Sequence, residues 1–106
     1  MKVLTSEELK QKIHSGEKFI VDMYADWCGP CLVLGPIVER VSQKLEEEGH
    51  EVKVYKFNIE SDKDLAVQLG VRSIPTIKVF DGGKVVDNRV GILQEQQLID
   101  LANSIL

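Results

Sequence analysis

The sequence predicts an α/β fold: a single domain over residues 1–106 in which helices cover both faces of a mixed β-sheet. A chain of 106 residues is the size of one domain with one core, and it contains no internal repeat or Pro/Gly-rich linker. Apolar runs typical of buried strands alternate with segments of helical periodicity, in the order βαβαβαββα. Strands separated by helices are expected to pair in parallel, and the last two strands to form an antiparallel hairpin.

The amino-terminal segment is expected to hold a short edge strand at residues 3–4, a helix and a buried strand. Thr5 and Glu8 stand at the reciprocal positions of a capping box, and Gly16 ends the helix. Residues 18–24 are apolar on both faces, which is typical of a strand between two layers of helices.

A long helix and a second inner strand follow. Apolar residues at helical spacing predict a helix from about residue 29 towards residue 48, with Pro36 inside it and Gly49 as its stop. Residues 52–58 are rich in β-formers and predict a strand.

The carboxyl-terminal part is expected to contain a short helix, a hairpin and a last helix. Ser61 and Asp64 match a capping signal for the short helix, and residues 81–83, Asp-Gly-Gly, form the hairpin turn. The last helix has a poor N-cap, because Leu93 and Gln94 stand where Ser or Asp is preferred. The strands are expected at residues 76–80 and 84–90. The short helix carries Leu65, Ala66 and Leu69 and is ended by Gly70, and the last helix carries Leu98, Leu101, Ala102 and Ile105.

Charge and hydropathy exclude several classes of function. The net charge is −4 and no Lys/Arg cluster is present, which argues against nucleic acid as a partner. Apolar stretches such as residues 19–21 are far too short to span a bilayer, so no membrane partner is expected. The amino terminus lacks the apolar segment of a secretory signal, so we expect a cytoplasmic location.

The two cysteines, Cys28 and Cys31, predict thiol–disulfide chemistry. They are separated by two residues, and a disulfide that closes so short a loop adds little stability. They lie where a buried strand ends and a helix begins, and a helix N-terminus stabilises a thiolate. We therefore expect Cys28 to be the exposed nucleophile and Cys31, one turn further and more buried, to resolve the mixed disulfide. Gly29 and Pro30 suit the first helical turn.

Two other interpretations of the cysteine pair are a zinc half-site and a pair of inert core thiols. Zinc normally takes four nitrogen or sulfur ligands. The remaining candidates, His14 and His50, fall at the ends of two different helices without the spacing of a metal site. We therefore favour a redox pair without a metal, since C-x-x-C beside a βαβ pattern is typical of redox proteins.

Asp22 is the only acidic residue in the apolar run of residues 18–24. A carboxylate buried without a partner is unfavourable, so its pKa should be raised. Such a group could accept the proton of Cys31 when that thiol attacks. The alternative is an aspartate near the strand end that reaches solvent.

The segment Trp27-Cys28-Gly29-Pro30-Cys31 resembles the active-site motif of the thioredoxin family. The resemblance extends along the chain to Val21-Asp22, Pro36, Ile74-Pro75-Thr76, Gly82-Gly83 and Gly91. It implies the thioredoxin fold, which is a three-layer α/β/α sandwich. It also implies a general protein-disulfide reductase that maintains cell redox homeostasis and is regenerated by a separate thioredoxin reductase.

The resemblance also implies roles for individual residues. Asp22 would take the proton from Cys31 through water, and Lys56 would tune Asp22, although Lys56 could equally point out of the sheet. The Ile74–Pro75 bond would be cis and pack against the cysteines. The expected substrate surface is a flat apolar patch made by Trp27, Gly29, Pro30, Ile74, Pro75 and Gly91, although Trp27 could instead pack as a lid on the domain.

Two positions depart from the family pattern, because Leu32 stands where many members carry Lys or Arg, and Tyr24 where Trp or Phe is usual. No G-x-G-x-x-G fingerprint is present, so no nicotinamide or flavin cofactor is expected, and we expect a monomer. Two rival functions remain: an oxidase or isomerase on the same fold, and a binding module that uses the apolar patch and ignores the thiols.

Overall fold

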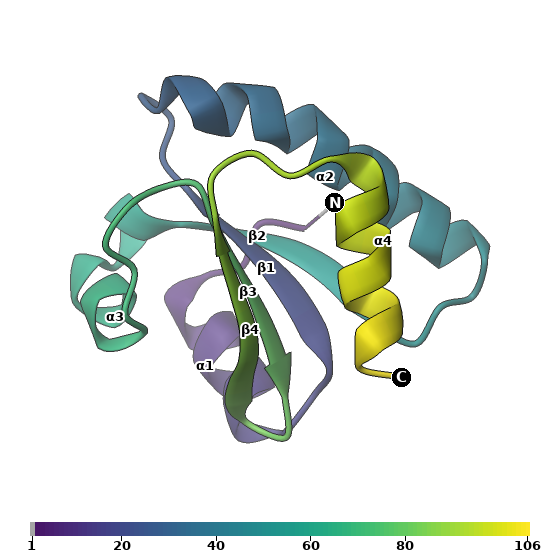
Figure 1. Cartoon of the computed structure of the whole chain (residues 1–106). Helices are drawn as coiled ribbons and strands as arrows, with labels where there is room; N and C mark the ends of the chain where they lie inside the picture. The colour runs from purple at the N-terminus through teal and green to yellow at the C-terminus, as the bar shows by residue number, and fades with distance from the viewer. Residues whose placement is uncertain (1) are drawn as a thin grey trace.

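Four strands form one mixed sheet at the centre of the fold, and helices lie on both of its faces (Figure 1). The computed structural model describes residues 2–106. In chain order the elements are α1 (Ser6–His14), β1 (Phe19–Tyr24), α2 (Gly29–Glu47), β2 (Lys53–Asn58), the 3₁₀ turn η1 (Ile59–Ser61), α3 (Lys63–Gln68), β3 (Thr76–Asp81), β4 (Lys84–Val90) and α4 (Glu95–Ser104).

The strand order in the sheet is β2-β1-β3-β4. The expected parallel pairing is confirmed for β1 and β2 but is wrong for β3, which runs antiparallel to β1. A helix must run back along the sheet to make the next strand parallel. The six residues of α3 extend only about 9 Å, whereas a six-residue strand extends about 20 Å. The chain therefore re-enters the sheet at the end where β2 left it.

The amino-terminal strand is shorter than the sequence predicts. It consists of one isolated bridge, in which Val3 pairs in parallel with Lys56 of β2. The Leu4 N–H donates to the Lys56 carbonyl at 2.8 Å, and the chain then turns into α1 at the predicted capping box of Thr5 and Glu8. The predicted stop is confirmed, since Ser15 is the C-cap and Gly16 follows it in the left-handed conformation, with φ of 77°.

The start of α3 also differs from the prediction. Its N-cap is Asp62, whose Oδ1 accepts from the Leu65 N–H at 2.9 Å, and not Ser61. The Ser61 hydroxyl donates instead to the Asn58 carbonyl, because Ser61 is the last residue of η1. The 3₁₀ turn thus delays the helix by one residue.

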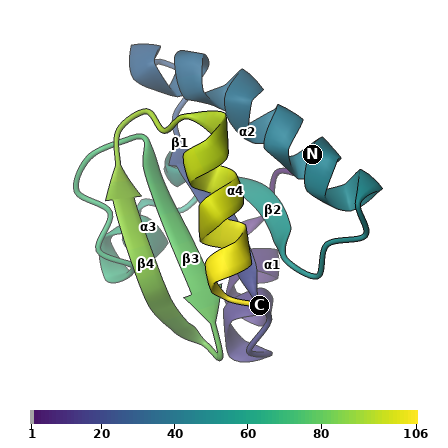
Figure 2. The same ribbon diagram turned by 45° about the vertical axis from the view of Figure 1, so that its right-hand side comes forward.

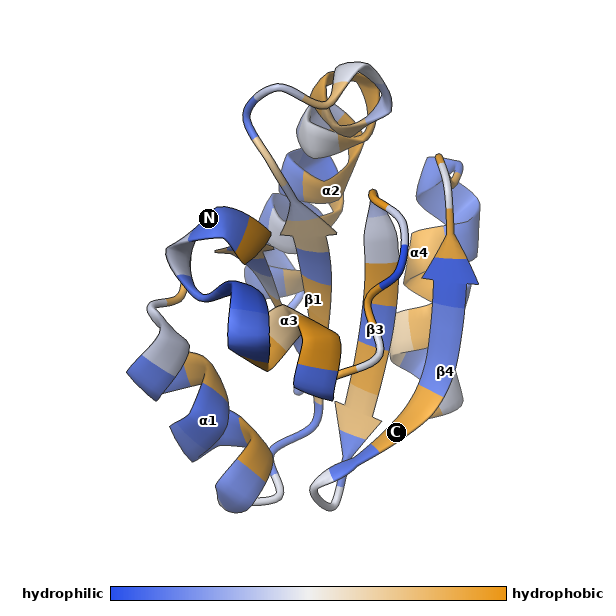
Figure 3. Cartoon of the chain, turned by 90° about the vertical axis from the view of Figure 1, so that its left-hand side faces the viewer, coloured by the Kyte–Doolittle hydropathy of each residue, from blue (hydrophilic) through white to orange (hydrophobic). Residues whose placement is uncertain are grey.

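Two apolar cores fill the space between the sheet and its helices, which confirms the three-layer arrangement. Helices α2 and α4 lie over one face (Figure 2), and α1 and α3 lie over the other (Figure 3). The first core includes Ile20, Leu34, Val38, Ile77, Leu98 and Leu101. The second includes Leu9, Phe19, Val21, Met23, Phe57 and Phe80. Neighbouring residues of β1 alternate between the two cores, as the continuous apolar run predicts.

Lys78 in β3 is buried on the face that α1 and α3 cover, and burial lowers its pKa. Its ammonium donates to Asn88 Oδ1 on β4 at 2.7 Å.

We expect Lys78→Met to raise the free energy of unfolding by about 1 kcal/mol, because a thioether of similar length needs no desolvation of a charge. Asn88→Ala should lower it by about 1 kcal/mol, because the ammonium loses its partner. Urea unfolding of both variants at pH 7 measures these changes, and a Lys78→Met protein less stable than the parent would contradict the expectation.

Candidate active site

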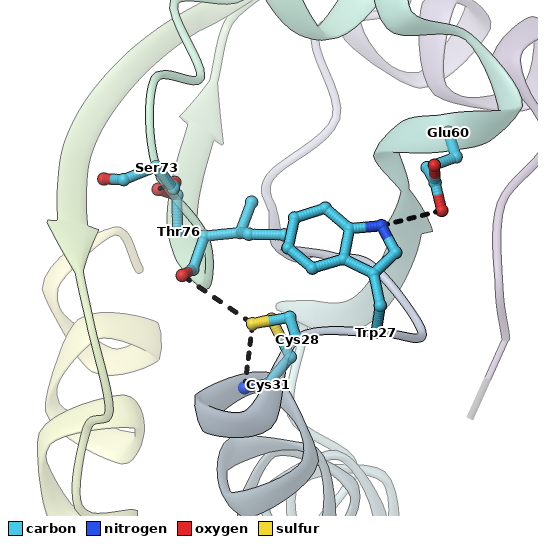
Figure 4. Close-up of a disulfide and its surroundings, with 7 residues drawn as sticks. Trp27, Cys28, Cys31, Glu60, Ser73 and Thr76 are labelled. Carbon is cyan, nitrogen blue, oxygen red and sulfur yellow. Dashed lines mark hydrogen bonds between the residues drawn. A yellow bond between two sulfur atoms is a disulfide. The ribbon is translucent and has the colours of Figure 1, made fainter.

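The cysteine pair lies at the junction of β1 and α2. Cys28 is the N-cap of α2, with extended backbone, and Pro30 occupies the first turn. The Cys31 N–H donates to Cys28 Sγ at 3.2 Å, and a disulfide joins the two side chains (Figure 4). The sulfur of Cys28 therefore faces unpaired backbone N–H groups at the positive end of the helix dipole, and this environment stabilises a thiolate in the reduced protein.

The predicted difference in exposure between the two cysteines is wrong for this oxidised state. Cys28 is 5% exposed and Cys31 is 4% exposed. The loop before β3 covers Cys28, since the Ile74 carbonyl oxygen lies 3.8 Å from Cys28 Sγ (Figure 4). The helix position of each cysteine could be predicted from sequence, but the cover supplied by a loop more than 40 residues away could not.

Three segments that are distant in sequence meet around Cys28. The Ile74–Pro75 peptide bond is cis, as the family resemblance implies. The Gly91 N–H donates to the Pro75 carbonyl at 2.9 Å, which holds the end of β4 against this loop. The predicted surface residues Trp27, Ile74 and Gly91 are thus brought to one side of the molecule with the cysteines.

Trp27 is 68% exposed and does not pack as a lid on the domain. Its indole N–H donates to Glu60 Oε1 of η1 at 2.9 Å, which orients the ring (Figure 4). Sequence analysis missed Glu60, because nothing in the sequence links an acid of a 3₁₀ turn to a tryptophan 33 residues earlier. Beside the ring lies a groove of about 320 Å³, lined by Trp27, Ile59, Val71, Arg72, Ser73 and Ile74.

Asp22 lies in β1 on the face of the sheet that α2 covers. Its side chain is fully buried, so it does not reach solvent as the alternative interpretation required. Neither carboxyl oxygen has a hydrogen-bond partner among residues 2–106. Burial raises the pKa of Asp22 from 3.8 to about 6, and the positive charge of Lys56 partly opposes this shift.

Lys56 lies opposite Asp22 in the ladder between β1 and β2. Its side chain points to the face covered by α2, where Nζ is 4.2 Å from the centroid of the Tyr24 ring. Lys56 therefore does not simply point away from the sheet. Next to it a pocket of about 260 Å³ is lined by Tyr24, Asp26, Cys31, Leu32, Gly35, Pro36, Glu39 and Lys56, together with Ala25.

The histidines considered as zinc ligands lie at the end of α1 and beyond the carboxyl-terminal end of α2, whereas the cysteines lie at the start of α2. His50 follows α2, where its Nε2 is 2.9 Å from Asn103 Oδ1 and its Nδ1 accepts from the Val52 N–H at 3.1 Å. His14 is the last residue of α1. Neither position agrees with a zinc half-site at the cysteine pair.

A disulfide that closes a loop of two residues at the start of a helix, on a mixed sheet between two helical layers, is typical of a thiol–disulfide oxidoreductase. Comparison with known proteins agrees with this class. The thioredoxin family profile matches residues 1–104. The thioredoxin of Rickettsia conorii is 38% identical over 101 residues, which are 95% of this chain and 93% of that protein. The thioredoxin of Mycoplasmoides gallisepticum is 36% identical over 95% of this chain and 98% of its own.

Solved structures give the same result. Chloroplastic thioredoxin z superposes with a TM-score of 0.81 at 31% identity, over 99% of this chain and 95% of the other. The thioredoxin of Malassezia sympodialis superposes with a TM-score of 0.85 at 26% identity, over 99% and 90% of the two chains. The chain belongs to the thioredoxin family, and it is a thiol–disulfide reductase that acts on protein disulfides. No helix within residues 2–106 has the length and apolar character needed to cross a membrane.

Proposed function

We propose that this chain works as a monomeric, single-domain reductase in the cytoplasm. A separate thioredoxin reductase then reduces the Cys28–Cys31 disulfide again. The observation that carries the proposal is the position of Cys28, whose sulfur caps α2 beside the open surface around Trp27 and Ile74. The helix N-terminus stabilises a capping thiolate, and the exposed surface beside it offers an incoming disulfide a place to dock.

The reaction has two exchange steps. The Cys28 thiolate attacks one sulfur of the substrate disulfide, which forms a mixed disulfide and releases the other sulfur as a thiolate. Cys31 then loses its proton and attacks Cys28 Sγ, which forms the internal disulfide and releases the second substrate thiol. Two electrons pass to the substrate, and the Cys28–Cys31 pair is oxidised.

Asp22 is proposed to accept the proton of Cys31 in the second step. A pKa of about 6 lets this carboxylate accept a proton near neutral pH and release it again. The absence of any hydrogen-bond partner for its oxygens among residues 2–106 leaves both free to bind a water that connects it to Cys31. Lys56 adjusts this proton affinity through its charge.

The proposed substrate surface surrounds Cys28. Trp27, Ile74 and Gly91 would contact an extended peptide on either side of its disulfide, and Pro75, which is buried, would hold Ile74 in place. Apolar contact is non-directional, so many proteins would fit. Gly29 and Pro30 are proposed to tune the redox potential, because they form the first turn of the helix that stabilises the thiolate.

The reduction potential of the Cys28–Cys31 pair tests the proposed direction of electron flow. We expect a value near about −270 mV, as is characteristic of thioredoxins, after equilibration with a dithiol buffer. A value of roughly −180 to −120 mV would instead favour the rival oxidase or isomerase. The binding-module rival requires full function without thiols, so a Cys28→Ser, Cys31→Ser double variant that keeps its function would favour that rival.

A further inference from the structure

Tyr24 lies where it can hold the ammonium of Lys56 in place. Asp22 and Tyr24 are two residues apart on β1, so their side chains point to the same face of the sheet. Lys56 is opposite Asp22 on the neighbouring strand β2. Its Nζ lies 4.2 Å from the Tyr24 ring centroid, which is within the range of a cation–π contact.

The other side of the ammonium is bounded by α2. A Cβ atom placed on the buried Gly35 would lie 3.7 Å from Lys56 Nζ, which is an ordinary contact distance, so α2 passes directly beside the ammonium. Among residues 2–106 no carboxylate oxygen lies within 4.0 Å of Lys56 Nζ. The cation–π contact with the Tyr24 ring is therefore the attraction, among residues 2–106, that restrains this flexible side chain.

We propose that Tyr24 is a positioning residue, whose ring holds the Lys56 ammonium beside Asp22 and thereby sets how readily this carboxyl group accepts a proton. The inference rests on the proposed role of Asp22 as the proton acceptor. Lysine has a long stem with many rotamers, and a free ammonium moves to water, where its field is strongly screened. The ring keeps it in the partly buried space under α2, where its charge acts on Asp22 with less screening.

The remaining ionisable groups around this space do not replace Lys56. Asp26 follows β1 and Glu39 lies on α2, and both line the adjacent pocket with Cys31. Asp26 and Glu39 are acids and Cys31 is part of the disulfide, so none of them can supply a positive charge. On the other side of Asp22, β3 places Ile77 opposite it, and α4 contributes apolar residues to the core.

The test is a titration of the Asp22 carboxyl carbon by NMR in the oxidised protein, which requires no activity. Lys56→Met should raise the midpoint, because the charge is lost. Tyr24→Leu should raise it by at least about half as much, because the ammonium is released. Tyr24→Phe is the matched control: it keeps the ring and should leave the midpoint unchanged. In the double variant, Tyr24→Leu with Lys56→Met, the midpoint should not exceed that of Lys56→Met alone.

Three results would overturn the inference: no change in Tyr24→Leu, no change in Lys56→Met, or shifts that add in the double variant. Additive shifts would mean that the ring acts on the solvation of Asp22 and not through Lys56. Should Tyr24→Leu fail to fold, Tyr24→Met provides the same comparison. The role of Asp22 itself is judged separately, by the reductase activity of Asp22→Asn.

Discussion

Replacing Cys31 with serine is expected to stop the reaction halfway. The Cys28 thiolate can still attack a substrate disulfide, but no second thiol lies beside it to release the product. The Cys31→Ser variant should therefore accumulate as a mixed disulfide with its substrate. Turnover should fall by at least about 10³-fold, as is usual when a residue of a covalent catalytic unit is removed.

Cys28→Ser is the matched control, because it removes the sulfur that caps α2 and leaves Cys31 in place. It should lose activity to the same extent but form no mixed disulfide. Non-reducing electrophoresis with mass spectrometry of the captured peptide distinguishes the two variants. Capture through Cys31 in the Cys28→Ser protein would mean that the roles of the two cysteines are exchanged.

Much of this site could be predicted because its residues are close in sequence. The strand end, the helix start and the cysteine spacing are all local features, and local periodicity places Cys28 at the N-cap of α2. The acid in an apolar strand likewise indicates a buried carboxyl group, and Asp22 is fully buried. In these cases propensity, pattern and tertiary structure agree.

The features that sequence analysis missed depend on contacts between distant segments. The burial of Cys28 comes from Ile74, and the orientation of Trp27 comes from Glu60. The direction of β3 depends on the length of a helix that carries the chain only part of the way back along the sheet. The face of the sheet to which the Lys56 side chain points depends on the register between β1 and β2. A shift of β2 by one residue would move each of its side chains to the opposite face.

Asp22 is expected to reduce the stability of the protein above its own pKa. The carboxyl group loses its proton near pH 3.8 in the unfolded chain but only near pH 6 in the folded one. Between these values the folded state binds more protons than the unfolded state, so the free energy of unfolding falls as the pH rises. The difference amounts to about 3 kcal/mol at pH 7 and above, and it disappears below about pH 4.

Asp22→Asn keeps the shape of the side chain and removes its ionisation. At pH 8 the variant should therefore be more stable than the parent by about 3 kcal/mol, with little difference at pH 4. Its reductase activity should fall by up to about 10²-fold, which is the lower end for loss of a general base, because Asp22 makes no hydrogen bond to Cys31. Urea unfolding of the oxidised proteins at several pH values measures the first effect, and turnover with a protein disulfide measures the second.

The two measurements together distinguish a carboxyl group that accepts a proton in the reaction from one that is buried without a role in it. An ionisable group that is buried without partners lowers stability at neutral pH, and most such positions are filled by apolar residues instead. A gain in stability with a loss of turnover means that this carboxyl group is retained for the second exchange step. An equal gain at pH 4 and pH 8 would show that ionisation is not the cause, and unchanged turnover would assign the proton of Cys31 to solvent.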